Sequence, residues 1–153
     1  MKKGIRLTGN LLHFDQENLN GRIYTKETVE KMVDQFNKLK ETGPVLGELG
    51  YPENFEVNLV NVSHEIEFVH LNEENKTLVG TIRLLDTPKG KIVQELVKPG
   101  HDIGLSCRPR VSGTVNENKE IEDYELFSFD LVSGPDAFGN IKENDYLTLF
   151  EDE

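Results

Sequence analysis

The sequence predicts an α+β fold built around a mostly antiparallel sheet or a small barrel. Short runs in which apolar and polar residues alternate recur along the chain, and this pattern is typical of half-buried strands. Two other segments have apolar residues at helical spacing, and each begins at a residue type that favours a helix N-terminus. The length of 153 residues suits one compact domain with a single core. Strands with two helices between them indicate the α+β class.

The N-terminal part is expected to contain one or two strands and the first helix. One or two strands cover residues 4–14, and the polar segment 15–24 is rich in turn-forming Asn and Gly. A helix is predicted over about residues 26–41, with Thr25 as its N-cap. Its buried stripe is expected to consist of Val29, Met32, Val33, Phe36 and Leu39.

A hairpin is predicted in the middle of the chain. Residues 44–54 are rich in Gly and Pro and are expected to form a structured loop. A long strand then runs from Phe55 to Leu71, and a second strand returns over residues 77–85 after the polar loop 72–76. One face of the long strand is expected to present Val60, Val62, His64, Ile66 and Phe68.

The last part of the chain is expected to hold the second helix and the final strands. Thr87 is placed as an N-cap and Pro88 as the first helical residue. Two strands are predicted over about residues 102–107 and 122–132, and a short one over residues 146–150. The buried side of the helix is expected to consist of Ile92, Val93, Leu96 and Val97.

Charge and composition exclude several classes of protein. The chain has 28 acidic and 17 basic residues and a net charge of −11, so it would repel phosphate groups. This argues against general binding to nucleic acid or to a membrane surface. No apolar run is long enough to span a membrane, and no signal peptide is recognised at the N-terminus. The single cysteine, Cys107, cannot form an internal disulfide, which favours a reducing compartment.

Three predicted strands each contain a residue that a serine hydrolase requires. Ser106 lies in the run Ile103–Arg108, His64 in the run Asn61–Ile66, and Asp130 in the run Phe127–Val132. A hydroxyl becomes a good nucleophile when an imidazole takes its proton and an acid orients that imidazole. The sequence therefore suggests a nucleophile, a base and an acid that meet in space.

Strand alternation places Ser106 on the polar side of its strand, with Arg108 and Arg110 further along the same side. Either arginine could stabilise an oxyanion directly or through water. The alternative is an ordinary surface strand with polar residues outward. Cys107 points to the opposite side and is expected to be a small core residue, although an error in parity would exchange its role with that of Ser106.

His64 and Asp130 also have structural explanations. A histidine on an apolar face is often a core residue with satisfied hydrogen bonds, and a buried aspartate can instead pair with an arginine or a backbone amide. Glu48 and Asp86 are competing candidates for the acid, although Asp86 is also placed to belong to the second helix. None of the four histidines has the spacing of a zinc motif, so no metal or other cofactor is expected.

Taken in order, six short motifs resemble those of the prohead core proteases of tailed bacteriophages, and the resemblance extends over about residues 18–138. The motifs are Asn20-Gly21-Arg22-Ile23-Tyr24, Gly47-Glu48-Leu49-Gly50-Tyr51-Pro52, Val62-Ser63-His64, Asp86-Thr87-Pro88-Lys89-Gly90, Gly104-Leu105-Ser106-Cys107-Arg108 and Phe129-Asp130-Leu131-Val132-Ser133-Gly134-Pro135.

The resemblance implies an assemblin-like fold, a small and mostly antiparallel β-barrel of about seven strands flanked by two or more helices. It also implies that Ser106 is the nucleophile, His64 the base and Asp130 the third member. Arg108 matches a family arginine that supports the oxyanion hole, and we group Arg110 with it as a substrate-binding residue. We expect residues 1–153 to form a single protease domain, with residues 139–153 as a C-terminal extension or tail.

The function that the resemblance implies is that of a serine endopeptidase of phage head maturation. Its substrates would be the internal scaffold and the major capsid protein, and it would act in the host bacterial cytoplasm, inside the assembling prohead. Self-association is left open, since assemblins act as dimers, and no nucleic acid or membrane partner is expected. The alternative is a non-catalytic virion or assembly protein, because phage tail-tube proteins share the fold.

Overall fold

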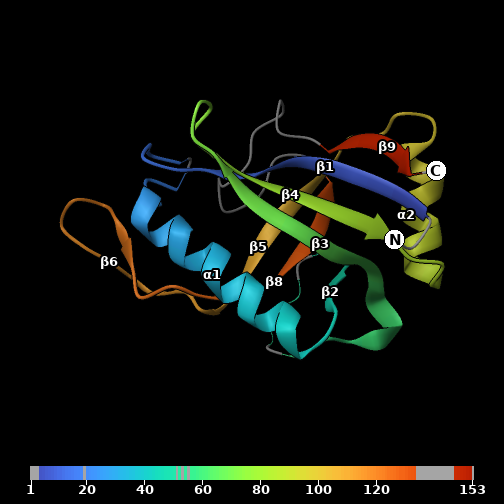
Figure 1. Cartoon of the computed structure of the whole chain (residues 1–153), viewed down its shortest axis with the longest axis horizontal. Helices are drawn as coiled ribbons and strands as arrows, with labels where there is room; N and C mark the ends of the chain where they lie inside the picture. Colours follow the sequence, from blue (N-terminus) through green and yellow to red (C-terminus); the bar gives the residue numbers. More distant parts are fainter. Residues whose placement is uncertain are drawn as a thin grey trace.

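A computed structural model of the chain describes residues 4–18, 20–50, 52, 54, 56–133 and 147–152. Within these residues, two α-helices accompany strands that pair almost entirely in antiparallel fashion, which confirms the α+β class (Figure 1). None of the described helices has the length and apolar character needed to cross a membrane.

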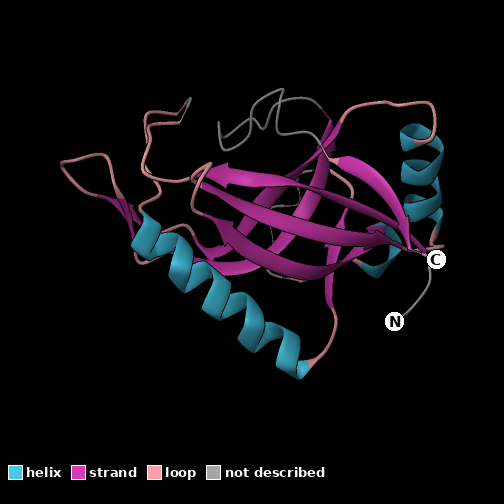
Figure 2. Cartoon of the chain, turned by 45° about the horizontal axis from the view of Figure 1, so that its top comes forward, coloured by secondary structure: helices cyan, strands magenta, loops and turns pink. Residues whose placement is uncertain are grey.

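Both predicted helices are present and begin at the predicted caps. Helix α1 spans Lys26–Thr42, and the Thr25 hydroxyl accepts a hydrogen bond from the Thr28 amide at 3.2 Å. Helix α2 spans Pro88–Val97, and Thr87 accepts from the Gly90 amide at 3.0 Å. A short 3-10 helix, η1, spans Leu59–Asn61. Figure 2 shows that α1 runs along one side of the strands and that α2 lies at the right-hand end of the molecule.

The larger sheet contains five strands in the order β2-β3-β4-β1-β9, and each neighbouring pair is antiparallel. The predicted hairpin is confirmed, because Asn72 at the end of β3 pairs with Thr77 at the start of β4. The strands are β1 (Gly4–His13), β2 (Val45–Glu48), β3 (Val62–Asn72), β4 (Thr77–Leu84) and β9 (Thr148–Asp152).

A second sheet pairs β5 (Ile103–Val111) with β8 (Glu125–Ser133) in antiparallel fashion. Both strands extend beyond the predicted ranges of 102–107 and 122–132 at their C-terminal ends. Between them, a small hairpin is formed by β6 (Thr114–Val115) and β7 (Ile121–Glu122).

The two larger sheets touch at both of their ends. At one end, Leu49 forms a parallel bridge with Leu131, and the Gly50 amide donates to the Leu131 carbonyl at 2.7 Å. At the other end, the Leu147 amide donates to the Ile103 carbonyl at 2.8 Å. The sheets therefore enclose a common interior, which both helices help to cover.

One described cluster of apolar side chains fills this interior and receives residues from both sheets and both helices. Helix α1 buries Val29, Met32 and Phe36, and the Phe36 ring lies 6.5 Å from the Phe129 ring of β8. Helix α2 buries Val93 and Val97. The prediction that Ile92 also faces the core is wrong, since its side chain is exposed.

Two predictions for residues 44–71 are wrong. The segment expected to be a loop contains β2, whose Gly47 pairs with His64 of β3. The long strand begins only at Val62, so Val60 lies in η1 and is 78% exposed. A register shift between Ile66 and Phe68 reverses the alternation, which leaves Phe68 51% exposed while Val69 faces the core.

The C-terminal segment also differs in part from expectation. Strand β9 begins at Thr148 and continues to Asp152, whereas the short strand was predicted over residues 146–150. Glu151 pairs with Ile5, and Asp152 pairs with Gly4. These residues form an edge strand of the five-stranded sheet, whereas residues 134–146 and 153 lie outside the described part of the chain.

Candidate active site

Ser106 and Asp130 lie directly opposite each other on β5 and β8. Residues opposite each other in an antiparallel pair have side chains on the same face, about 4.5–5.5 Å apart at Cβ. The alternate residues Leu105 and Cys107 belong to the hydrophobic core, so Ser106 and Asp130 are on the face turned away from the core. The predicted parity of this strand is therefore confirmed, including the core position of Cys107.

Arg108 occupies the same face and is buried between two carboxylates. Its Nε lies 3.1 Å from Asp130 Oδ2, and its Nη1 lies 3.1 Å from Glu48 Oε2. The guanidinium also stacks over the Phe127 ring, 4.8 Å from the centroid. All three charged side chains are at most 4% exposed, so the ion pairs are scarcely screened by solvent.

Glu48 connects this charged cluster to the chain that precedes β3. Its carboxylate accepts from the Asn58 amide at 3.1 Å and from the Asn61 side chain at 3.3 Å. Asn61 also donates to the Leu49 carbonyl at 2.9 Å. Arg108 in turn donates to the Asn54 carbonyl at 3.3 Å. Asn54, Asn58 and Asn61 are thereby held beside the face that bears Ser106 and Asp130.

His64 is fully buried, and both of its ring nitrogens have partners. Nε2 lies 2.8 Å from the Phe129 carbonyl oxygen, and Nδ1 lies 2.7 Å from the Ser63 hydroxyl. A carbonyl oxygen can only accept, so Nε2 carries the hydrogen. In a neutral ring Nδ1 then has no hydrogen and accepts from the Ser63 hydroxyl.

Gly47 allows the His64 ring to reach this position. A Cβ at residue 47 would lie 2.1 Å from His64 Nε2 and 2.2 Å from the Phe129 oxygen. No side chain larger than hydrogen fits at that distance, so the ring packs directly against the Gly47 backbone.

The contacts between β2 and β8 are made largely by side chains, and we call this line of contact the β2–β8 seam. The Glu48 amide donates to Asp130 Oδ1 at 3.0 Å, and the Ser128 hydroxyl donates to the Leu46 carbonyl at 2.7 Å. Along β8, the hydrogen bond from His64 to the Phe129 carbonyl lies between these two contacts. The His64 ring therefore replaces part of the backbone ladder that would otherwise join the two strands.

Burial shifts the pKa of both titratable candidates. Loss of solvation lowers the pKa of His64 to about 4, the Phe129 hydrogen bond opposes this, and the Arg108 charge adds to it. Burial also raises the pKa of Asp130 to about 7. The hydrogen bond from the Glu48 amide and the positive charge of Arg108 act in the opposite direction and lower this pKa. The Glu48 carboxylate contributes to the higher Asp130 pKa, since one arginine cannot neutralise two acids. His64 is therefore neutral at physiological pH.

The structure brings together some of the predicted site residues and not others. Ser106, Asp130 and Arg108 share one face. Asp130 forms an ion pair with Arg108 and accepts a hydrogen bond from a backbone amide, which is the alternative that the sequence left open. His64 pairs with Leu84, a core residue, so its side chain leaves β3 on the core-facing side. Neither of its ring nitrogens bonds to Ser106 or Asp130.

The remaining candidates lie at the margin of the site or outside it. Arg110 is exposed and stacks over the Phe127 ring, 5.4 Å from the centroid. Asp86 accepts from the Gln94 side chain at 3.1 Å and so belongs to the start of α2. Sequence patterns gave no sign of the roles of Ser63 and Gly47, because both depend on pairing between distant strands.

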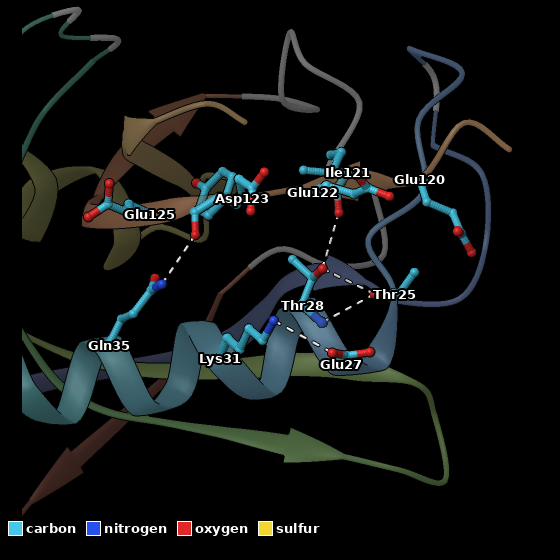
Figure 3. Close-up of a pocket in the computed structure, with 11 residues that line it drawn as sticks. Thr25, Glu27, Thr28, Lys31, Gln35, Glu120, Ile121, Glu122, Asp123 and Glu125 are labelled. Atoms are coloured by element: carbon cyan, nitrogen blue, oxygen red, sulfur yellow. Dashed lines mark hydrogen bonds and ion pairs between the residues drawn. The ribbon is translucent and has the colours of Figure 1, made fainter. Parts of the chain in front are cut away.

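One cavity is separate from this site. It has a volume of about 690 Å³ and lies between α1 and residues 120–125 (Figure 3). Its walls are held by bonds from Thr28 to the Ile121 carbonyl and from Gln35 to the Tyr124 carbonyl, each 3.1 Å long. Its lining includes the acidic side chains of Glu27, Glu120, Glu122, Asp123 and Glu125.

No three His, Cys, Asp or Glu side chains in the described ranges come together in a way that could hold a metal ion.

Comparisons with known proteins point to one family. The family profile described as prohead core protein serine protease matches residues 1–148. Among solved structures, the chain is similar to the capsid assembly protease gp21 of bacteriophage T4, with a TM-score of 0.74 and 26% sequence identity. That similarity covers 88% of this chain and 85% of the other. No curated protein sequence matches the chain.

Proposed function

The chain belongs to the prohead core serine protease family, and on this basis we propose that Ser106 and His64 perform its reaction. It is a serine endopeptidase of phage head maturation. The observation that best supports Ser106 as the nucleophile is its position opposite Asp130. Both residues lie on the side of the β5–β8 sheet that is turned away from the core, next to the buried Arg108.

In the proposed reaction, the Ser106 hydroxyl attacks the carbonyl carbon of a peptide bond while His64 accepts the hydroxyl proton. The tetrahedral intermediate collapses when His64 passes that proton to the leaving amine, which breaks the C–N bond and leaves an acyl ester on Ser106. A water molecule, deprotonated by the same imidazole, then hydrolyses the ester. Each step is a proton or acyl transfer that these side chains can complete without a cofactor.

We propose Asp130 as the acid of the site and Arg108 as the residue that positions it. Asp130 faces Ser106 across the strand pair, so an imidazole that reached the Ser106 hydroxyl would come close to this carboxylate. Arg108 Nη2 is buried and has no hydrogen-bond partner within the described residues. It therefore has a donor left for a substrate oxygen, which supports the oxyanion role suggested by the resemblance. Arg110 would act further out, on the exposed side of Phe127.

We further propose that the strands close into a small assemblin-like barrel. The contacts of Leu49 with Leu131 and of Leu147 with Ile103 join the two sheets at both ends. Around the interior, the strand order would then be β5-β8-β2-β3-β4-β1-β9 and back to β5.

The substrates are proposed to be the internal scaffold and the major capsid protein, cut inside the assembling prohead in the host cytoplasm. The T4 neighbour is a capsid assembly protease, which supports this substrate class. An extended segment would lie beside η1, where Leu59 and Val60 are 73% and 78% exposed on a turn fixed by Glu48 and Asn58. Exposed apolar side chains held rigidly beside an active site can bind apolar substrate side chains.

The test is processing of scaffold and capsid substrates by Ser106→Ala, with Cys107→Ala as the matched neighbour. We expect Ser106→Ala to abolish cleavage and Cys107→Ala to retain it, because only Ser106 is on the site face. Normal processing by Ser106→Ala would refute the assignment.

A further inference from the structure

The Ser63 hydroxyl already occupies the nitrogen that His64 would need as a base. His64 donates from Nε2 to the Phe129 carbonyl, so the lone pair available to accept a proton is on Nδ1. That lone pair accepts from Ser63 at 2.7 Å. A general base must direct this lone pair at the nucleophile, within about 2.6–3.2 Å. The hydroxyl of Ser63 therefore competes with the hydroxyl of Ser106 for the same nitrogen.

Ser63 cannot itself be the nucleophile, although it makes the serine–histidine contact of a hydrolase. Its side chain is 0% exposed beneath α2, whereas that of Ser106 is 4% exposed on the site face, so a peptide carbonyl would have to displace α2 to reach Ser63. Its backbone is fixed as well, because the Ser63 carbonyl accepts from the Leu85 amide at 3.1 Å. A Cβ on Gly90 would come within 2.8 Å of that same carbonyl, which shows how closely α2 covers this point.

We propose that Ser63 and the Phe129 carbonyl hold His64 in a latent position, and that the protease works only after Nδ1 exchanges the Ser63 hydroxyl for that of Ser106. We call these two contacts the His64 latch. The inference rests on the proposed function of Ser106 and His64. Ser63 is on this view a positioning residue, since it acts through His64 and not on the substrate.

The β2–β8 seam gives the ring a path between the two faces. The ring tip already lies between the strands, at the Phe129 carbonyl, and Gly47 has no side chain to block it. The neighbouring seam contacts of Glu48 and Ser128 each involve a side chain, which can change rotamer without breaking a backbone ladder. Release of the latch therefore requires side-chain rotation near the seam and leaves β3 in place.

The latch is tested by the rate at which a fluorophosphonate labels Ser106 in the full-length chain. Ser63→Ala removes the competing hydroxyl and leaves a buried nitrogen without a partner, so we expect labelling to be about two- to tenfold faster than in the wild type. Ser63→Thr keeps a hydroxyl at the same position and should label at the wild-type rate. Labelling of Ser63→Ala at or below the wild-type rate would overturn the proposal.

Nitrogen chemical shifts of the His64 ring give a readout that does not depend on activity or on a variant. The wild-type protein should show the tautomer with hydrogen on Nε2 and a hydrogen-bonded acceptor at Nδ1. A ring with hydrogen on Nδ1 would overturn the latch, because Ser63 could not then donate to that nitrogen.

Failure of the latch and failure of the proposed function give different results. If Ser106→Ala is labelled as fast as the wild type, the proposed role of Ser106 is wrong whatever Ser63 does. If labelling requires Ser106 and is unchanged in Ser63→Ala, the function stands and the latch alone is refuted.

Discussion

The imidazole Nε2 of His64 donates a hydrogen bond to the carbonyl oxygen of Phe129 at 2.8 Å. The contact joins β3 to β8 past Gly47 of the intervening strand β2, and it determines which ring nitrogen carries no hydrogen and can accept a proton. One partner of this contact, His64, is proposed for catalysis, and the other, Phe129, is next to Asp130. The same bond therefore stabilises the fold and determines where the candidate base lies.

Gly47→Ala should destabilise the protein, because the new methyl group would overlap both partners of this bond at 2.1 and 2.2 Å. Overpacking at a buried site costs about 1–3 kcal/mol, and here the rigid Phe129 backbone cannot move away easily. Urea denaturation of the wild type and the variant measures the difference in unfolding free energy.

His64→Ala provides the control, since it removes one of the two overlapping groups. Gly47→Ala should cost less in the His64→Ala background than in the wild type, by about 0.5–3 kcal/mol. Equal costs in both backgrounds would mean that the ring does not lie against Gly47.

Arg108→Ala should be strongly destabilising. It would leave Glu48 and Asp130 buried without their counter-charge, and breaking a buried pair in this way costs about 3–5 kcal/mol. Arg110→Ala is the matched control, because Arg110 stacks on the same Phe127 ring but is exposed. Its loss should cost less than about 1 kcal/mol. Similar costs for the two arginines in urea denaturation would contradict the buried charge cluster.

His64 and Asp130 should change stability with pH in opposite directions. The pKa of His64 falls from 6.5 to about 4 on folding, so its contribution is complete above 6.5 and is lost as pH falls toward 4. The pKa of Asp130 rises from 3.8 to about 7, so its contribution is complete below 3.8 and is lost as pH rises toward 7. In the wild type the two effects partly cancel.

Two variants separate these slopes. His64→Gln retains only the Asp130 effect, and Asp130→Asn retains only the His64 effect. Between about pH 4 and 7, the unfolding free energy of Asp130→Asn should rise relative to that of His64→Gln, by a few kcal/mol, on the order of 1.4 kcal/mol per unit of pKa shift. Carboxylates outside the Glu48–Arg108–Asp130 cluster titrate equally in both proteins and cancel in the comparison. Parallel pH profiles would contradict the pKa shifts.

Leu59→Ser and Val60→Ser should weaken substrate binding while leaving the chemical step intact. Loss of an apolar contact with an extended peptide should raise KM by about two- to tenfold with little change in kcat. Val115→Ser is a suitable control, because Val115 is exposed on the β6–β7 hairpin, away from the residues of the site. A fall in kcat with unchanged KM would show that η1 supports the catalytic residues and does not bind substrate.

Local signals were sufficient to predict the helices and the β3–β4 hairpin. The caps at Thr25 and Thr87 determine where the helices begin, and such caps involve only residues within one turn. The polar loop after Asn72 similarly connects two strands that are adjacent in the chain. These features depend on neighbours along the sequence, so a single sequence contains the information.

Strand β2 and the exposure of Val60 and Phe68 could not be predicted in the same way. From its local sequence, Gly47 looked like a loop residue. Its small size is required by His64, which lies 17 positions later in the chain, and local sequence does not reveal that contact. The register shift after Ile66 is a property of the pairing with β4 and has no local signature. In both cases contacts with distant strands override local preference.

The candidate site was predicted in its residue types but not in its contacts. Asp130 and Ser106 were chosen from separate strands, and the register places them opposite each other. The backbone amide of Glu48 donates a hydrogen bond to Asp130. From the sequence, Glu48 was considered only as an alternative to Asp130 for the acid of the site. The position of the His64 ring depends on Ser63, Gly47 and Phe129 together, and that combination is visible only in three dimensions.

The most direct test of the central claim is to identify the residue that a fluorophosphonate modifies covalently. The wild-type chain is incubated with the reagent, digested and analysed by mass spectrometry, with Ser106→Ala in parallel. We predict a single adduct on Ser106, lost in Ser106→Ala together with cleavage of scaffold and capsid substrates. An adduct on another residue, or substrate cleavage that persists in Ser106→Ala, would contradict the assignment of Ser106 as the nucleophile.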